Sequence, residues 1–251
     1  MEIIPLSEGS FSIDKTKVFV PFDTDNNPIT NRPAGSILVE IQPFLIVTKK
    51  DILLIDTGLG YNLPDGTPQL YDNLEKVGYN PSQITKVLMS HLHKDHAGGI
   101  TIKSDATGEQ LIAFPYATYY VQRREFDYAM GIGSASYINS DFAVLEEFSK
   151  VVWLAEDQGI IDGYIHYQLT GAHSKFHQVF WLVEDEKTCF FGGDDAPQLQ
   201  QMKNRFVAKY DFDGKKCMEL RRQWWEEGNN KKWSFLFYHD INSPVYNGLT
   251  I

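Results

Sequence analysis

The sequence predicts an α/β protein in which two mixed β-sheets pack together and are flanked by helices. Two observations predict this class. The halves of the 251-residue chain repeat one order of features: paired strands, a loop with Gly and Asp, a helix, a strand and a histidine. The paired strands also favour a mixed sandwich over a doubly wound parallel sheet. Because no linker separates the halves, we expect a single domain over residues 1–251.

The first half begins with apolar, strand-like residues over 37–48 and 51–56, and the polar residues between them predict a hairpin turn. A helix is expected over 69–77, because its leucines have helical spacing and Gly78 follows at the natural stop. The short apolar stretch 86–90 then predicts a buried strand that leads into a histidine-rich loop.

The second half repeats this outline. Strands are expected over 178–183 and 188–191, joined by a polar turn and followed by two glycines and two aspartates. A helix over 214–227 and a strand over 234–238 come next, and that strand leads into a histidine. The duplication indicates two similar β-rich halves, each covered by helices.

An aromatic-rich insert lies between the halves, at about residues 106–150. Helices are expected over 122–130 and 141–150, with a glycine-containing joint between them. The aromatic side chains would either form local core or line the wall of a pocket. The segment could equally form the interface of a dimer, and the sequence leaves these interpretations open.

Composition restricts the class of partner. The formal net charge of −10 argues against nucleic acid, whose binding depends on Lys and Arg, although a local basic groove stays compatible with it. No apolar run is long enough to predict a membrane span. The N-terminal residues lack the features of a signal peptide, so we expect a cytoplasmic protein with a small-molecule substrate. The two cysteines, Cys189 and Cys217, are expected to stay reduced and to have no catalytic role.

The most informative stretch follows the strand at 86–90. It contains three histidines and an aspartate within six residues: His91, His93, Asp95 and His96. Imidazole and carboxylate groups are ligands of zinc and similar divalent metals. One short loop cannot easily wrap all four around a single tetrahedral ion. We therefore expect two ions, one held by the first two residues and one by the last two, with further ligands from elsewhere in the chain.

Three more polar residues lie at the ends of expected strands, as His91 does. These are His173, Asp194 and His239. Side chains so placed can gather at one edge of a sheet sandwich, where a two-metal site needs additional imidazoles and a bridging carboxylate. His166, in contrast, lies within a strand and is not expected to bind metal.

With these residues in view, the chain resembles the metallo-β-lactamase superfamily. The resembling parts occur in the family's order: Ile55-Asp56-Thr57-Gly58, Ser90 to Gly99, Thr170-Gly171-Ala172-His173, Gly193-Asp194 and Tyr238-His239. The resemblance implies a four-layer αβ/βα sandwich of two mixed sheets flanked by helices. In length and in the form of its histidine motif, the chain looks closest to the lactonase-like branch.

The resemblance also implies roles for the ligands. The first metal would be held by three histidines: His91, His93 and His173. The second would be held by Asp95, His96 and His239. Asp194 would bridge the two ions, in preference to the adjacent Asp195.

Two further residues are expected to lie behind the ligands. Asp56 resembles the family's buried aspartate, which orients an imidazole N–H, and its alternative role is that of a turn residue or helix N-cap. His177 either supports the ligands in the same way or caps the next strand, and the sequence does not choose between these roles.

The predicted function is that of a dinuclear metal-dependent hydrolase, which uses a metal-bound hydroxide on a small ester, lactone or thioester. Asp95 or Asp194 would take the proton from the bound water. Zinc is the default metal, and manganese, iron, cobalt or nickel suit the same ligands. Acyl-homoserine lactonases carry a tyrosine shortly after the bridging aspartate, and here residues 195–199 contain none, so the substrate stays open.

Two alternatives use the same fold. One is a phosphodiesterase or nuclease, which would need a basic groove near the metals. The other is a mononuclear iron oxidoreductase that resembles the persulfide dioxygenases.

Overall fold

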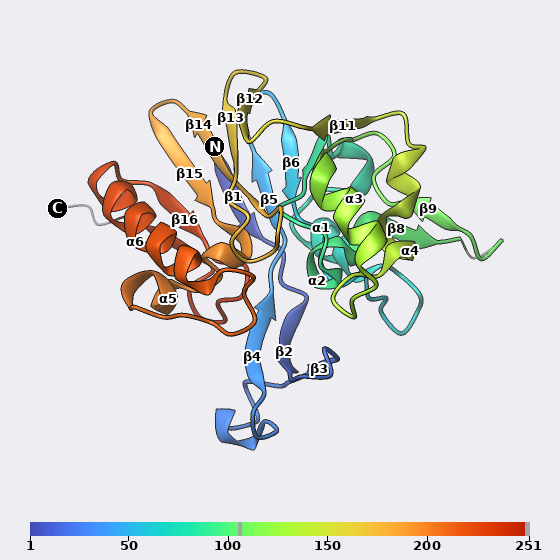
Figure 1. Cartoon of the computed structure of the whole chain (residues 1–251). Helices are drawn as coiled ribbons and strands as arrows, with labels where there is room; N and C mark the ends of the chain where they lie inside the picture. Colours follow the sequence, from blue (N-terminus) through green and yellow to red (C-terminus); the bar gives the residue numbers. More distant parts are fainter. Residues whose placement is uncertain (105–106, 249–251) are drawn as a thin grey trace.

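The computed structural model of the chain describes residues 1–104 and 107–248. Two six-stranded sheets form its centre, and helices cover the outer face of each, which gives four layers in the order αβ/βα (Figure 1). The predicted fold class is therefore confirmed. Ala106, the first residue of the predicted insert, and residues 249–251 of the predicted domain lie outside the described residues.

The first sheet holds the strand pairs expected from the first half. Its strands, in spatial order, are β1 (Glu2–Pro5), β5 (Phe44–Val47), β6 (Ile52–Ile55), β7 (Lys86–Leu88), β10 (Thr118–Gln122) and β11 (Val151–Leu154). Strands β5 and β6 form the antiparallel hairpin. Helix α1 (Gln69–Lys76) then returns the chain, so that β7 pairs with β6 in parallel.

The second sheet repeats this arrangement. Its strands, in spatial order, are β12 (Gln158–Ile161), β13 (Ile165–Leu169), β14 (Gln178–Glu184), β15 (Lys187–Phe191), β16 (Ser234–Leu236) and β17 (Val245–Asn247). Strands β14 and β15 form the hairpin, and β16 pairs with β15 in parallel after the helices α5 (Leu199–Lys203) and α6 (Gly214–Asn230). The turn residues Asp185 and Glu186 have φ of 49° and 63°, as expected for a two-residue turn that matches strand twist.

Three hydrophobic clusters hold the four layers together. In the first sheet, period-two alternation sends Leu45 and Leu54 toward the helices, and it sends Phe44 and Leu53 toward the second sheet. A third cluster lies between the second sheet and its helices and includes Trp224 of α6. Each sheet therefore buries both faces.

The strand-like run predicted over 37–48 is two strands rather than one. Pro43 interrupts it, because proline has no N–H to donate to a ladder. Strand β4 (Ile37–Ile41) instead joins β2 (Gly9–Ile13) and β3 (Phe19–Pro21) in a separate sheet of order β3-β2-β4. We call residues 9–41 the arm, because they project away from the sandwich in Figure 1.

The segment predicted as an aromatic insert contributes to the sandwich. It contains β9 (Gln110–Ile112), which pairs with β8 (Thr101–Lys103), and the sheet strand β10. The predicted helix over 122–130 is α3 (Arg123–Ile132), and the Gln122 side chain accepts a hydrogen bond from the Arg124 N–H at its start.

The prediction of a helix over 141–150 is wrong in its extent, because the α-helix at this position ends at Phe142. Helix α4 (Asn139–Phe142) passes into a 3₁₀ turn (Ala143–Glu146), and the chain then turns into β11. Phe142 and Leu145 are fully buried in the cluster between the first sheet and its helices. Burying both side chains and still reaching the sheet requires this tighter backbone.

The described part of the chain contains no helix both long enough and apolar enough to cross a membrane. The cytoplasmic location stays a prediction. Cys189 and Cys217 are both free and buried, and burial raises the pKa of each thiol. A thiol in such surroundings is protonated and inert.

Candidate metal centre

The predicted ligands lie together just beyond the carboxyl ends of four strands. His91 follows β7, His173 follows β13, Asp194 follows β15 and His239 follows β16. The loop after β7 continues into the short helix α2 (Lys94–Ala97), which places Asp95 and His96 one turn beyond the first ligands. The ligands thus come from both sheets and meet at one edge of the sandwich.

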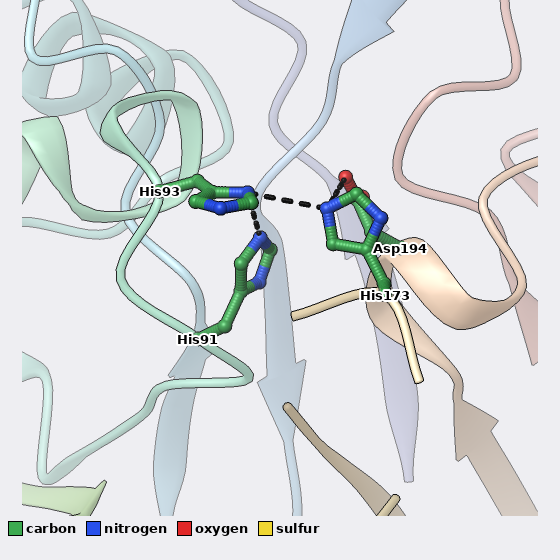
Figure 2. Close-up of side chains that lie close together, drawn as sticks. All are labelled: His91, His93, His173 and Asp194. Atoms are coloured by element: carbon green, nitrogen blue, oxygen red, sulfur yellow. Dashed lines mark hydrogen bonds and ion pairs between the residues drawn. The ribbon is translucent and has the colours of Figure 1, made fainter. Parts of the chain in front are cut away.

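The first cluster consists of His91, His93, His173 and Asp194 (Figure 2). His93 Nδ1 lies 2.9 Å from His91 Nε2 and 3.1 Å from His173 Nε2. His173 Nε2 in turn lies 3.2 Å from Asp194 Oδ2. Three imidazole nitrogens and one carboxylate oxygen therefore point at one another.

The second cluster consists of Asp95, His96, Asp194 and His239. Asp194 Oδ1 lies 3.1 Å from His96 Nε2 and 3.0 Å from His239 Nε2. Asp95 Oδ2 lies further from the same two nitrogens, at 3.8 Å and 3.5 Å. Asp194 belongs to both clusters, because one oxygen faces each of them.

The donor sets fit divalent metal ions. His96 Nδ1 lies 2.8 Å from Asp56 Oδ2, which turns Nε2 of the same ring toward the Asp194 carboxylate. Within residues 1–104 and 107–248, neither His96 Nε2 nor Asp194 Oδ1 has a hydrogen-bond partner, although both are buried. A nitrogen and a carboxylate oxygen that are both buried, face each other and have no hydrogen-bond partner are suited to share a divalent cation.

The electrostatics of the two clusters differ. Burial, reinforced by neighbouring imidazoles, lowers the pKa of His91 and of His93 well below its usual value. Burial acts in the same direction on His96, but Asp194 and the other nearby carboxylates outweigh it and raise the pKa of His96 well above its usual value. Burial tends to raise the pKa of Asp194, yet the imidazoles around it, His239 first, hold it well below its usual value. The second cluster therefore concentrates negative charge that favours a cation.

Asp56 lies behind the second cluster. Its backbone has φ of 56°, and its Oδ1 accepts a hydrogen bond of 2.7 Å from the Ser90 N–H. Its Oδ2 accepts from the Ser90 hydroxyl and from His96 Nδ1. Asp56 thus fixes the orientation of the imidazole and ties it to the end of β7.

His177 and Asp195 support the opposite side. The Asp194 N–H donates to His177 Nε2 at 3.2 Å, and His177 Nδ1 lies 3.1 Å from Asp195 Oδ2. Asp195 Oδ1 accepts from the His173 N–H at 2.7 Å, so this carboxylate faces away from both clusters. Gly193 has φ of +49°, and a Cβ there would lie 2.6 Å from His177 Nε2, which explains the glycine before Asp194.

Sequence reasoning missed two buried acidic groups that hold the ligand loops. Asp211 Oδ1 lies 2.8 Å from His173 Nδ1. Glu125 Oε1 accepts hydrogen bonds from the Leu92 N–H and from the hydroxyls of Tyr137 and Ser174. Neither has a local sequence signal, because each is brought to its partner only by the tertiary fold.

A cavity of about 1020 Å³ opens above the two clusters. It is bounded by the arm, by α3 and the loop after it, and by the segment that leads into α6. Its aromatic lining consists of Phe19, Tyr128, Tyr137, Phe206, Tyr210 and Phe212. The aromatic segment 106–150 therefore supplies both core and pocket wall. His166 is absent from both clusters and pairs instead with Ile160 and Trp181 in the second sheet.

Comparison with known proteins agrees with this geometry. An N-acyl homoserine lactonase of Bacillus thuringiensis is 24% identical over 228 residues, which cover 83% of this chain and 84% of that relative. The N-acyl homoserine lactonase AttM of Rhizobium johnstonii is 35% identical over 74 residues, or 28% of this chain. The match to AttM covers only 24% of that relative's length.

Solved structures share the fold along nearly the whole chain. A probable metal-dependent hydrolase from Staphylococcus aureus superposes with a TM-score of 0.78 at 22% identity, covering 98% of this chain and 91% of that one. AidC, a dizinc quorum-quenching lactonase, superposes with a TM-score of 0.71 at 18% identity, covering 97% and 88%.

The family model described as the metallo-beta-lactamase superfamily matches residues 40–221. This chain belongs to that superfamily, and the lactonase-like branch is the part of it that the chain resembles.

Proposed function

We propose that this protein is a dinuclear hydrolase that acts on a small ester, lactone or thioester. The observation that carries the proposal is the position of Asp194, whose two carboxylate oxygens face two separate sets of ligands. A carboxylate in that position can bridge two ions. The named relatives, which are lactonases, support a carbonyl substrate.

The ligand assignment is part of the proposal. One ion would be held by His91, His93 and His173. The other would be held by Asp95, His96 and His239. Asp194 would bridge them. Zinc suits these nitrogen and oxygen donors, the solved relative AidC is described as dizinc, and manganese, iron, cobalt or nickel would fit the same ligand types.

Two bound ions would lower the pKa of a shared water toward neutrality and would polarise the substrate carbonyl. Asp95 is the better proton acceptor of the two candidate aspartates. Both carboxylate oxygens of Asp194 face imidazole nitrogens of the two clusters. Only one oxygen of Asp95, Oδ2, does so, and its distances to those nitrogens are longer. Asp95 also lines the cavity, so its other oxygen can hold a proton and deliver it to the leaving group.

We further propose that the chain works as a single domain. Strand β1, at the beginning of the chain, lies in the first sheet, and β17, near its end, lies in the second. The ligands also come from both halves. A site of this kind requires both sheets at once.

Metal analysis and a substrate panel test the proposal together. Protein loaded with zinc should contain about two ions per chain, as a dinuclear site requires, and should hydrolyse at least one class among aryl esters, lactones and thioesters. Full loading without any such hydrolysis would contradict it. One iron per chain with oxygen consumption would instead favour the oxidoreductase.

A phosphodiesterase is the second candidate, because several basic side chains line the cavity. Hydrolysis of bis(4-nitrophenyl) phosphate at a rate comparable to that of the best carbonyl substrate would favour it. The fold and the metal ligands would be the same for both reactions.

A further inference from the structure

The residues that line the cavity include more basic than acidic side chains, whereas the chain as a whole is acidic. Six of the 23 Lys and Arg residues line it, but only four of the 33 Asp and Glu residues do. The six basic residues are Lys15, Lys17, Arg32, Lys94, Lys175 and Lys209. Positive charge is therefore gathered over the candidate metal centre of an acidic protein.

The carboxylates of the cavity already have partners. Asp95 and Asp194 belong to the second cluster, and Asp211 bonds to His173. Asp14 accepts hydrogen bonds from the N–H and the hydroxyl of Thr16. In contrast, none of the six basic side chains forms an ion pair with a carboxylate within the described ranges 1–104 and 107–248.

The basic residues come from segments far apart in the sequence. Lys15 and Lys17 lie in the turn between β2 and β3 of the arm, and Arg32 lies in the loop before β4. Lys94 begins α2, Lys175 follows the ligand His173, and Lys209 precedes Tyr210. The tertiary fold brings these residues together. On the charged outer face of a single helix, in contrast, lysines are neighbours simply because of the helical spacing.

Two of these lysines, Lys17 and Lys94, are half-buried in the cavity, whose floor is formed by the two ligand clusters. Lys17 has φ of 60°, its N–H donates to the Asp14 carbonyl at 3.0 Å, and its side chain is half-buried. Lys94 Nζ lies 5.9 Å from the centre of the Phe19 ring.

Three of the lysines, Lys15, Lys175 and Lys209, are exposed and so lie at the mouth of the cavity, and apolar side chains line it as well. The cavity is lined by Phe19 and Val39 of the arm, by Ile241 after the last ligand, and by Phe212 before α6. A ligand that fills this space therefore meets the metal ligands at one end, apolar side chains along its body and ammonium groups at its other end.

We infer that the cavity selects esters or lactones that carry an anionic group, a carboxylate or a phosphate, at the end remote from the scissile carbonyl. The inference rests on the proposed hydrolase function for the reaction and adds the class of substrate. Unpaired lysines beside a partly enclosed apolar wall can bind an anion without first breaking an internal ion pair.

A matched pair of esters tests the inference. 4-Nitrophenyl hexanoate and mono(4-nitrophenyl) hexanedioate have the same chain length and differ only in a terminal methyl or carboxylate group. The zinc-loaded protein should have the higher kcat/KM for the anionic ester, after subtraction of the spontaneous reaction. High salt, from about 0.01 M to about 1 M, should reduce that preference because it screens exposed charges. A 5-phosphonopentanoate ester, in which a phosphonate takes the place of the terminal carboxylate, shows whether a carboxylate or a phosphate-like group is preferred.

The triple variant Lys15→Gln/Lys175→Gln/Lys209→Gln should lower the ratio of the two kcat/KM values about tenfold, since each exposed pair contributes a factor of roughly two to five. Lys187→Gln is the matched control, because Lys187 is exposed at the hairpin turn of β15, far from the cavity lining. A ratio that is the same in the triple variant, the control and the natural sequence would overturn the inference.

Measurements of binding affinity test this inference independently of the proposed hydrolase function. Hexanoate and hexanedioate can each place one carboxylate on the floor, but only hexanedioate has a second one for the lysines. Calorimetry on the zinc-loaded protein should show tighter binding of hexanedioate, and the triple variant should lose that advantage. This result would support the inference even if no ester were hydrolysed. Equal affinities would contradict it even if hydrolysis were efficient.

Discussion

The floor of the cavity is built from side chains that are mostly buried, whereas the part of its wall that leads into α6 is built from exposed side chains. His96 is 0% exposed and is held by Asp56, while Tyr210 and Phe212 are 41% and 63% exposed. Moving a floor residue disturbs a buried hydrogen-bond network, but replacing one of these exposed wall residues changes only what the cavity contacts. On the proposed function, changes in the floor should alter metal binding and the reaction, and changes in this part of the wall should alter which substrate binds.

The largest effect should follow removal of a floor ligand. His93→Ala should lose the first ion and lower kcat/KM by at least about a thousandfold, because one Lewis-acidic ion contributes several kcal/mol to the transition state. Metal content and activity should be measured on the same preparation. His166→Ala is the control and should retain both. Full metal content in His93→Ala would contradict the ligand assignment.

A buried glutamate beneath the floor should make stability depend on pH. Burial raises the pKa of Glu8 to about 8, and its Oε2 accepts the Leu59 N–H at 2.7 Å. The folded state therefore binds a proton that the unfolded state releases above about pH 4.5. Stability from this group is complete below that pH and is lost as the pH rises toward 8, by at most about 5 kcal/mol.

Glu8→Gln removes this ionisation and keeps an acceptor for Leu59. Denaturant unfolding should show the variant gaining stability relative to the natural sequence between about pH 5 and pH 8. Glu2→Gln, at an exposed position of β1, is the control. Parallel stability curves for Glu8→Gln and the natural sequence across this range would show that Glu8 is ionised in the fold.

A smaller effect is expected from the support behind the first cluster. Asp211→Ala removes the acceptor for His173 Nδ1 and should weaken metal binding about 10–100-fold. Competition with a chromogenic chelator measures this affinity. The exposed Asp65→Asn provides the comparison, since Asp65 contacts only its own turn. If Asp211→Ala bound metal as tightly as the natural sequence, the contact between Asp211 and His173 would not contribute to metal binding.

The smallest effect should come from the wall. Phe212→Ala should raise KM for a long-chain ester about fivefold, because it removes part of one apolar contact surface. KM for an acetate ester and the metal content should stay unchanged. Loss of metal in this variant would show that floor and wall are not independent.

Much of the floor could be predicted from the sequence. His91 to His96 lie next to one another, and the remaining ligands each follow an apolar strand that is recognisable locally. The duplicated order of strand pair, helix and strand also determines which strand ends meet. Position along a strand is a local property, so periodicity was sufficient to find it.

The wall and the supports could not be predicted in this way. Asp211 reaches His173 only through the path of the chain between α5 and α6. The arm exists because Pro43 divides one apolar run between two sheets. The basic residues of the cavity come from unrelated segments, and the overall charge of −10 conceals them. These features depend on tertiary contacts that leave no periodic signal.

The shared carboxylate of Asp194 also has a consequence for assembly of the protein. Each half of the chain contributes an incomplete set of ligands, and the bridging group comes from the second half. A nascent or partly folded chain with only the first sheet formed would expose the histidines without the residue that joins the two sets. On the proposed ligand assignment, tight metal capture would come after the two sheets dock, and metal retention would report that folding is complete.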